Sequence, residues 1–72
     1  MDESRLRMAA RHVEEGRRIV ERQRRLIADQ QARGKNTERS QWLLATFELT
    51  QAAFEDDLAS LRRERPLQSA GR

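Results

Sequence analysis

The first half of the chain repeats apolar positions every three or four residues over residues 3–33. This spacing places the repeated residues on one side of an α-helix, and the arginine, glutamate, glutamine and alanine residues between them favour a helix as well. We therefore predict one helix over residues 3–33, about 45 Å long at about 1.5 Å per residue. The row consists of Leu6, Ala9, Val13, Gly16, Val20, Gln23, Ile27 and Gln30, and it is flanked by His12, Ile19 and Leu26.

A second row with the same spacing predicts a second helix over residues 38–65. Pro66 sets the far end of this helix, because the residue before a proline disfavours the helical conformation. We therefore expect residues 66–72 to be a frayed tail. The second row consists of Leu44, Phe47, Gln51, Phe54, Leu58 and Leu61.

Residues 34–37 separate the two predicted helices. Gly34 suits the left-handed residue that ends a helix, and Asn36 or Thr37 suits the N-cap of the next helix. Such a short connection favours antiparallel neighbours. The sequence therefore predicts a single all-α domain over residues 1–72, an antiparallel two-helix hairpin.

Two kinds of residue in the facing rows are unusual for a helix–helix seam. Gly16 falls opposite Phe54 when the chain is folded at the turn, and a mid-helix glycine costs about 0.5–1 kcal/mol relative to alanine. Room for the aromatic ring would explain the glycine, and the alternative is a tolerated glycine without a role. Gln23, Gln30 and Gln51 either hydrogen-bond across the seam and set its register or lie half-exposed at its edge.

The second predicted helix has a further apolar surface, nearly opposite its seam on a helical wheel. An exposed apolar patch with a tryptophan at its head is typical of an interaction site. Self-association is the simplest explanation, because two hairpins form a four-helix bundle. We expect the interface of a homodimer, or of a complex with another protein, to use Ile19, Leu26, Trp42, Ala45, Leu49, Ala52 and Ala53.

The charges divide between the two helices. Residues 2–33 hold nine arginines and six acidic residues, whereas residues 36–61 hold one arginine and five acidic residues. A basic helix beside an acidic one favours the predicted orientation, although surface ion pairs add only about 0–1 kcal/mol each. The formal net charge of the chain is +3.

An arginine stripe on the outer face of the first helix is the basis of an alternative function. Phosphates attract such a stripe, so nucleic-acid binding is the alternative to self-association. The stripe contains interleaved glutamates and no aromatic residue, which favours a solvated face instead. Its members are Arg11, Arg18, Arg22 and Arg25.

The chain offers few groups for catalysis or metal binding. It has no cysteine or tyrosine, and His12 is its only histidine, so no nucleophile with a base and an orienting group can be named. The pair His12 and Glu15 lacks the repeat on a second helix that di-iron bundles need. Apolar runs are far shorter than the roughly 20 residues that cross a bilayer. We expect a cytoplasmic, non-enzymatic protein without metal, cofactor or membrane association.

Four short motifs complete the sequence picture: His12-Val13-x-x-Gly16, Leu26-Ile27, Gly34-x-x-Thr37 and Leu43-Leu44-x-x-Phe47. With them, residues 11–61 resemble a group of small bacterial helical-hairpin proteins of unassigned function. The resemblance implies a natural two-helix unit and carries no active site or ligand. We predict an interaction or regulatory protein.

Overall fold

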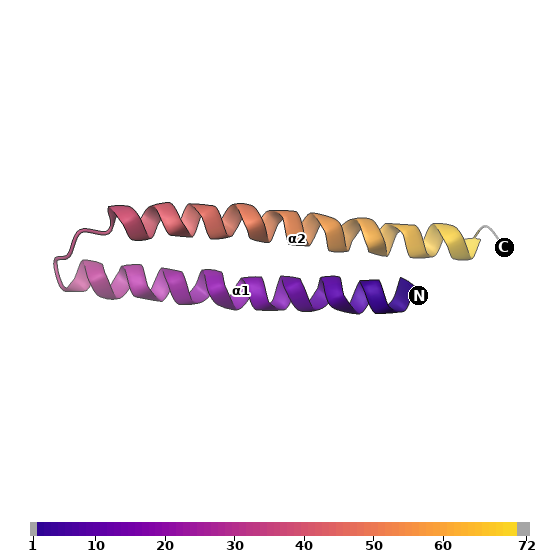
Figure 1. The fold of residues 1–72 in the computed structure, drawn as a ribbon, viewed down its shortest axis with the longest axis horizontal. Helices are drawn as coiled ribbons and strands as arrows, with labels where there is room; N and C mark the ends of the chain where they lie inside the picture. Colours follow the sequence, from indigo (N-terminus) through magenta and orange to yellow (C-terminus); the bar gives the residue numbers. More distant parts are fainter. Residues whose placement is uncertain (1, 71–72) are drawn as a thin grey trace.

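The protein is a long helical hairpin. The computed structural model describes the backbone of residues 2–70 and the side chains of residues 4–64. Helix α1 spans Asp2–Ala32 and helix α2 spans Glu38–Ala70, and the two lie antiparallel, side by side (Figure 1). Together they form a rod with principal extents of 60 × 15 × 13 Å. The predicted all-α antiparallel hairpin is confirmed for the single chain.

The side of α1 that packs on α2 is the predicted row. Ala9, Val13, Gly16, Val20, Gln23 and Ile27 are all buried. On α2, the residues buried against α1 are Gln51, Leu58 and Leu61, while Leu44, Phe47 and Phe54 are only half-buried. Among the described side chains none is completely buried, because each helix has a single neighbour.

The end of α1 is closed by the glycine that the sequence indicated. Gly34 has a φ of 72°, and its N–H donates to the carbonyl of Gln31 at 3.0 Å. The N–H of Lys35 donates to the carbonyl of Gln30 at 2.8 Å. These two bonds form a Schellman motif, which satisfies carbonyls that the end of a helix otherwise leaves free.

The start of α2 is capped by Asn36. Its Oδ1 accepts a hydrogen bond of 2.8 Å from the N–H of Glu38, one of the amide groups that the first turn of a helix leaves without a partner. The first backbone bond of the helix follows, from the N–H of Gln41 to the carbonyl of Thr37 at 2.8 Å. The acidic Glu38 stands at the positive end of the helix dipole, where a negative charge is favourable.

The predicted end of the second helix is wrong. Helix α2 continues beyond residue 65 to Ala70, so residues 66–70 are helical, and only 71–72 of the predicted tail lie outside the described residues. A proline removes one backbone hydrogen bond from a helix, but it does not by itself end one. The leucine, glutamine and alanine that follow Pro66 have high helix propensity.

Candidate interaction surface

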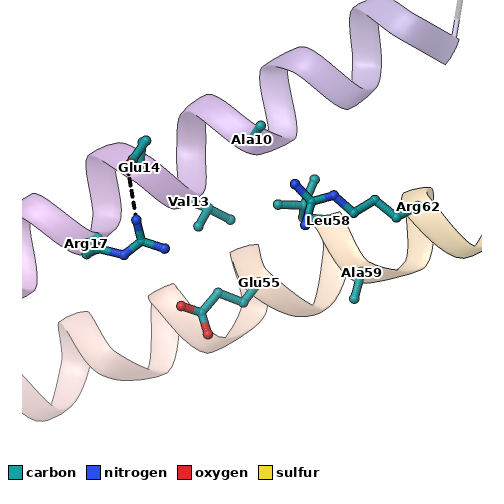
Figure 2. Close-up of a pocket in the computed structure, with 8 residues that line it drawn as sticks. All are labelled: Ala10, Val13, Glu14, Arg17, Glu55, Leu58, Ala59 and Arg62. Atoms are coloured by element: carbon teal, nitrogen blue, oxygen red, sulfur yellow. Dashed lines mark hydrogen bonds and ion pairs between the residues drawn. The ribbon is translucent and has the colours of Figure 1, made fainter.

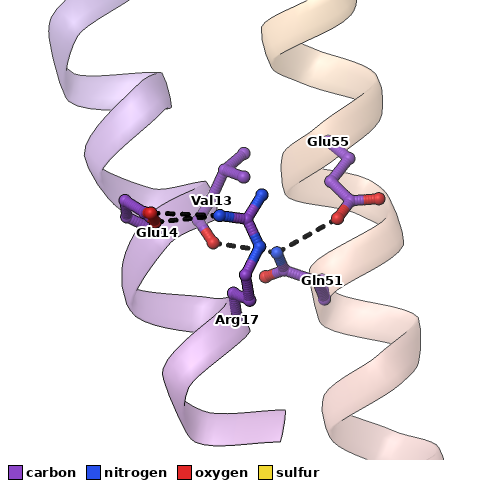
Figure 3. A network of polar contacts seen from close by, with 5 residues as sticks. All are labelled: Val13, Glu14, Arg17, Gln51 and Glu55. Atoms are coloured by element: carbon purple, nitrogen blue, oxygen red, sulfur yellow. Dashed lines mark hydrogen bonds and ion pairs between the residues drawn. The ribbon is translucent and has the colours of Figure 1, made fainter. Parts of the chain in front are cut away.

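A buried glutamine joins the two helices at the middle of the hairpin. Gln51 lies on α2, and its Nε2 donates to the backbone carbonyl of Val13 on α1 at 2.9 Å and to Glu55 Oε2 at 3.2 Å (Figure 3). A helix carbonyl has a second lone pair that accepts such a bond. The contact therefore ties α2 to the backbone of α1 at one register.

Gly16 makes room for this glutamine. A Cβ atom at position 16 would overlap Gln51 Oε1 and lie 2.8 Å from Gln51 Cδ. Phe54 is the next neighbour, with its Cδ2 at 3.4 Å, which is ordinary contact. The expectation that Gly16 accommodates Phe54 is therefore correct only in part, because the amide of Gln51 occupies most of the space.

A second buried glutamine makes the corresponding contact near the turn. Gln23 on α1 donates from Nε2 to the backbone carbonyl of Ser40 on α2 at 3.0 Å, and both residues are buried. Hydrogen bonds across the seam are thus the correct alternative for Gln23 and Gln51, whereas Gln30 lies half-buried beside the turn. The predicted row did not include Ser40, although its position seven residues before Phe47 puts it on the seam.

One side of the hairpin carries a groove lined by both charged and apolar residues. Its two hollows have volumes of about 390 and 360 Å³, and Arg17 and Glu55 line both. Arg17 binds Glu14 on its own helix at 3.0 Å, and Arg24 reaches Glu48 on α2 at 2.8 Å. The hollow nearer the open end of the hairpin appears in Figure 2 and is lined by Ala10, Val13, Glu14, Arg17, Glu55, Leu58, Ala59 and Arg62.

The ion pairs contribute little stability, and of those described only Arg24 with Glu48 joins the two helices. All three of the described ion pairs lie between side chains that are roughly half exposed, where a pair is worth about 0–1 kcal/mol. The contact of Arg24 with Glu48 agrees with the predicted pairing of a basic and an acidic helix. Arg17 binds Glu14 on its own helix, and Glu55 on α2 lines the same groove.

The opposite side of the hairpin holds an aromatic contact and two partly exposed aliphatic side chains. The rings of His12 and Phe54 lie 5.2 Å apart with an angle of 31° between their planes, and Asp57 lines a shallow hollow beside His12. Ile19 and Leu26 follow His12 at seven-residue steps, so they lie on this side of α1. They are 42% and 44% exposed and border the half-buried row of α2.

The most exposed large apolar side chains lie on the outer face of α2, which is turned away from α1. Trp42 is 66% exposed and Leu49 is 75% exposed. Ala45 and Ala53 are exposed beside them, whereas Ala52 lines the groove. The seven predicted interface residues therefore do not form one patch. Ile19 and Leu26 lie on one side of the hairpin, Ala52 lies on the other, and the remaining four lie on the outer face of α2.

The arginine stripe is also solvent-exposed. Arg11, Arg18, Arg22 and Arg25 are all exposed on α1. The ion pairs found within residues 4–64 involve other arginines, at positions 17, 24 and 33. The four side chains of the stripe thus remain available to an anionic partner.

No three histidine or acidic side chains come together among the described residues, as a metal site would require. Neither helix, as far as the structure describes it, has a segment long and apolar enough to cross a membrane. The fold and its surfaces define an elongated two-helix hairpin in which the apolar outer face of α2 is uncovered. Comparisons with known protein families, with curated proteins and with solved structures find no match.

Proposed function

We propose that this protein is a non-enzymatic interaction or regulatory protein that acts as a homodimer, in which two hairpins form a four-helix bundle. The proposed contact surface is the apolar surface that a single hairpin leaves uncovered. The candidate residues are Trp42, Ala45, Leu49 and Ala53 on the outer face of α2, Ala52 at the groove, and Ile19 and Leu26 on the other side of the hairpin. A cytoplasmic location belongs to the same proposal, and cell fractionation tests it.

The exposure of Trp42 and Leu49 is the observation that carries this proposal. Both side chains point away from α1 and are two-thirds or more exposed. Covering one large apolar side chain is worth about 1.5–3 kcal/mol, so the hairpin gains from any apolar partner placed there. A short chain that buries a modest core is typically stabilised by oligomerisation.

Size-exclusion chromatography with light scattering tests the assembly at micromolar concentration. We expect a mass about twice that of the 8.5 kDa chain. A chain that stays monomeric and still unfolds cooperatively would contradict the homodimer. If Trp42 were then freely accessible to quenchers, a different protein would be the remaining partner for the same surface.

Nucleic-acid binding is a second candidate, favoured by the exposure of the arginine stripe, whose members take part in none of the described ion pairs. Binding of labelled duplex DNA or RNA through Arg11, Arg18, Arg22 and Arg25 depends on counterion release and falls steeply as salt rises. Fluorescence anisotropy at about 50 and 200 mM salt measures this dependence. No binding at the lower salt concentration rejects this candidate, and apolar self-association shows no such loss with salt.

A further inference from the structure

We propose that the second copy of this chain docks along the outer face of α2 with its own α2, antiparallel and in a single register. In this register Trp42 packs on the partner's Ala53, and Leu49 packs on the partner's Thr46. The inference rests on the proposed homodimer and specifies which of its surfaces forms the contact. Each α1 helix then lies on the outside of the assembly, so this inference replaces a closed four-helix bundle with a row of four helices in which the two α2 helices are in the middle.

The contact uses a second seam on α2, formed by Trp42, Thr46, Leu49 and Ala53. The four residues follow one another at steps of four, three and four positions, and all are exposed in the hairpin. This spacing is that of the contact positions in a coiled coil, where side chains of one helix fit between those of another. The seam therefore matches a helix of similar pattern, which a second α2 supplies.

The seam is free of charge along its length. Between Arg39 and Glu55 the only charged residue is Glu48, and its side chain turns to α1, where it binds Arg24. Residues 40–54 therefore hold a single charged residue, which is few for a chain of which 38% is charged. A helix can therefore cover this stretch of α2 without removing an unpaired charge from water, which would be costly.

The threonine hydroxyls on this face already have acceptors. Thr46 Oγ1 donates to the carbonyl of Trp42 at 3.1 Å, and Thr50 Oγ1 donates to the carbonyl of Thr46 at 3.2 Å. Burying a hydroxyl is costly only where its hydrogen bond is lost. Covering these two side chains therefore leaves neither hydroxyl donor unsatisfied.

Side-chain size selects the register. Pairing Trp42 with the partner's Ala53 places the largest side chain of the seam against the smallest. The same register pairs Leu49 with the partner's Thr46, and the twofold axis repeats both contacts. A shift of one heptad in one direction brings Thr46 against the partner's Asp56, and the opposite shift brings Leu49 against the partner's Arg39, so either shift covers a charge.

Charge selects the antiparallel direction. The position that precedes the seam is Arg39, and the position that follows it is Asp56, both exposed. In the proposed register Arg39 lies beside the partner's Asp56 at each end of the contact. Parallel helices would instead bring arginine against arginine and aspartate against aspartate, which is unfavourable.

Charge reversal tests the direction of the two helices. Arg39→Asp alone and Asp56→Arg alone should each weaken the dimer, by roughly tenfold in dissociation constant, since two attractive contacts become repulsive. The double variant should regain the affinity of the unchanged chain. The two positions lie about 25 Å apart within one helix at about 1.5 Å per residue, so the recovery cannot come from a contact inside one chain.

Single cysteines test the register, because the chain has none of its own. In the proposed dimer the two copies of position 46 are offset by about 4.5 Å along the axis, and the two copies of position 53 by about 16 Å. A short thiol-to-thiol crosslinker should therefore join Thr46→Cys into a covalent dimer and leave Ala53→Cys unjoined. Neither substitution removes Trp42 or Leu49.

The outcomes separate this inference from the homodimer itself. A dimer that crosslinks equally at both positions has parallel helices. A dimer that crosslinks at neither, or whose double charge variant fails to recover, docks through another surface such as Ile19 and Leu26. Each of these results overturns the register while leaving the homodimer intact, whereas a monomeric unchanged chain overturns both.

Discussion

Gly16 and Gln51 act as one unit at the centre of the hairpin. The glycine leaves the space that the amide of Gln51 fills, and the amide uses that position to bond the carbonyl of Val13. The Oε1 atom of Gln51 is buried with no hydrogen-bond partner among the described residues. Since it lies where a Cβ of residue 16 would stand, its neighbour is the Cα–H of Gly16, a weak donor. The helix-breaking tendency of glycine is thus offset by a contact between helices.

Replacing Gly16 by alanine should therefore lower the stability of the protein. The change improves helix propensity by about 0.5–1 kcal/mol, but it displaces the Gln51 amide from its bond with Val13, and a buried polar group without a partner costs about 1–3 kcal/mol. We expect a net loss of about 1 kcal/mol in the free energy of unfolding, measured by urea denaturation.

The matched control compares Gln51→Ala alone with the double variant that carries Gly16→Ala and Gln51→Ala. Without the amide, the next neighbour of the new methyl group is Phe54, at an ordinary distance. Gly16→Ala should then stabilise the protein, by about 0.5–1 kcal/mol. A stabilising effect of similar size in both backgrounds would show that Gln51 does not occupy the space beside Gly16.

The residues at the ends of the two helices determine the hairpin as much as the rows of apolar residues do. Helix α1 ends because Gly34 adopts a left-handed conformation that lets the following amides bond back to the helix. Helix α2 begins because Asn36 caps its first turn. These few residues reverse the chain, and the reversal sets which positions of the two rows meet.

Gly34→Ala should destabilise the hairpin through the backbone alone. No atom lies within 4 Å of a Cβ at this position, so crowding contributes nothing. The left-handed conformation costs a residue with a side chain about 1–2 kcal/mol, and thermal or urea unfolding measures that loss. Gly34→Asn should lose less, because asparagine tolerates this conformation; equal losses for the two variants would contradict the assignment.

The molecule as a whole has one helix–helix contact and two uncovered apolar regions. Most helical stability in proteins comes from packing of an amphipathic face, and here α2 has apolar residues on its back as well as on its packed side. A rod of 60 × 15 × 13 Å shields little of its own surface. The assembly state therefore bears on stability and function together.

Trp42→Ser combined with Leu49→Ser should abolish self-association and reduce helicity together. The two substitutions remove the most exposed apolar groups of the outer face, which the second copy covers in the proposed dimer. Light scattering measures the mass, and circular dichroism measures the helix content. The matched control, Ile19→Ser with Leu26→Ser, should keep the dimer, and the reverse pattern would assign the contact to the side of α1.

The fluorescence of Trp42 should follow the dimer on dilution. In a single hairpin this side chain is 66% exposed, whereas the partner's helix covers it in the proposed dimer. We expect the emission to shift to the red and to become more readily quenched as the concentration falls. An emission that is red-shifted and quenched at every concentration at which the protein is dimeric would place Trp42 outside the contact.

The sequence by itself determined the two helices and the turn, because the residues that indicate each of them lie close together in the chain. The spacing of Ala9, Val13, Val20 and Ile27 marked the packed side of α1, and Gly34 marked the turn, so the hairpin followed from periodicity and turn chemistry. The extent of α2 beyond Pro66 was missed, since a proline opposes a helix without excluding it.

Only the tertiary structure decided what each seam residue contacts. Periodicity places Gly16, Gln51 and Phe54 on facing rows, but which side chain fills the space beside a glycine depends on the separation and rotation of the two helices. The same holds for Ser40, whose burial comes from its approach to Gln23. The apolar back of α2 could be listed from the sequence, whereas its separation from Ile19 and Leu26 appeared only once α1 was packed against it.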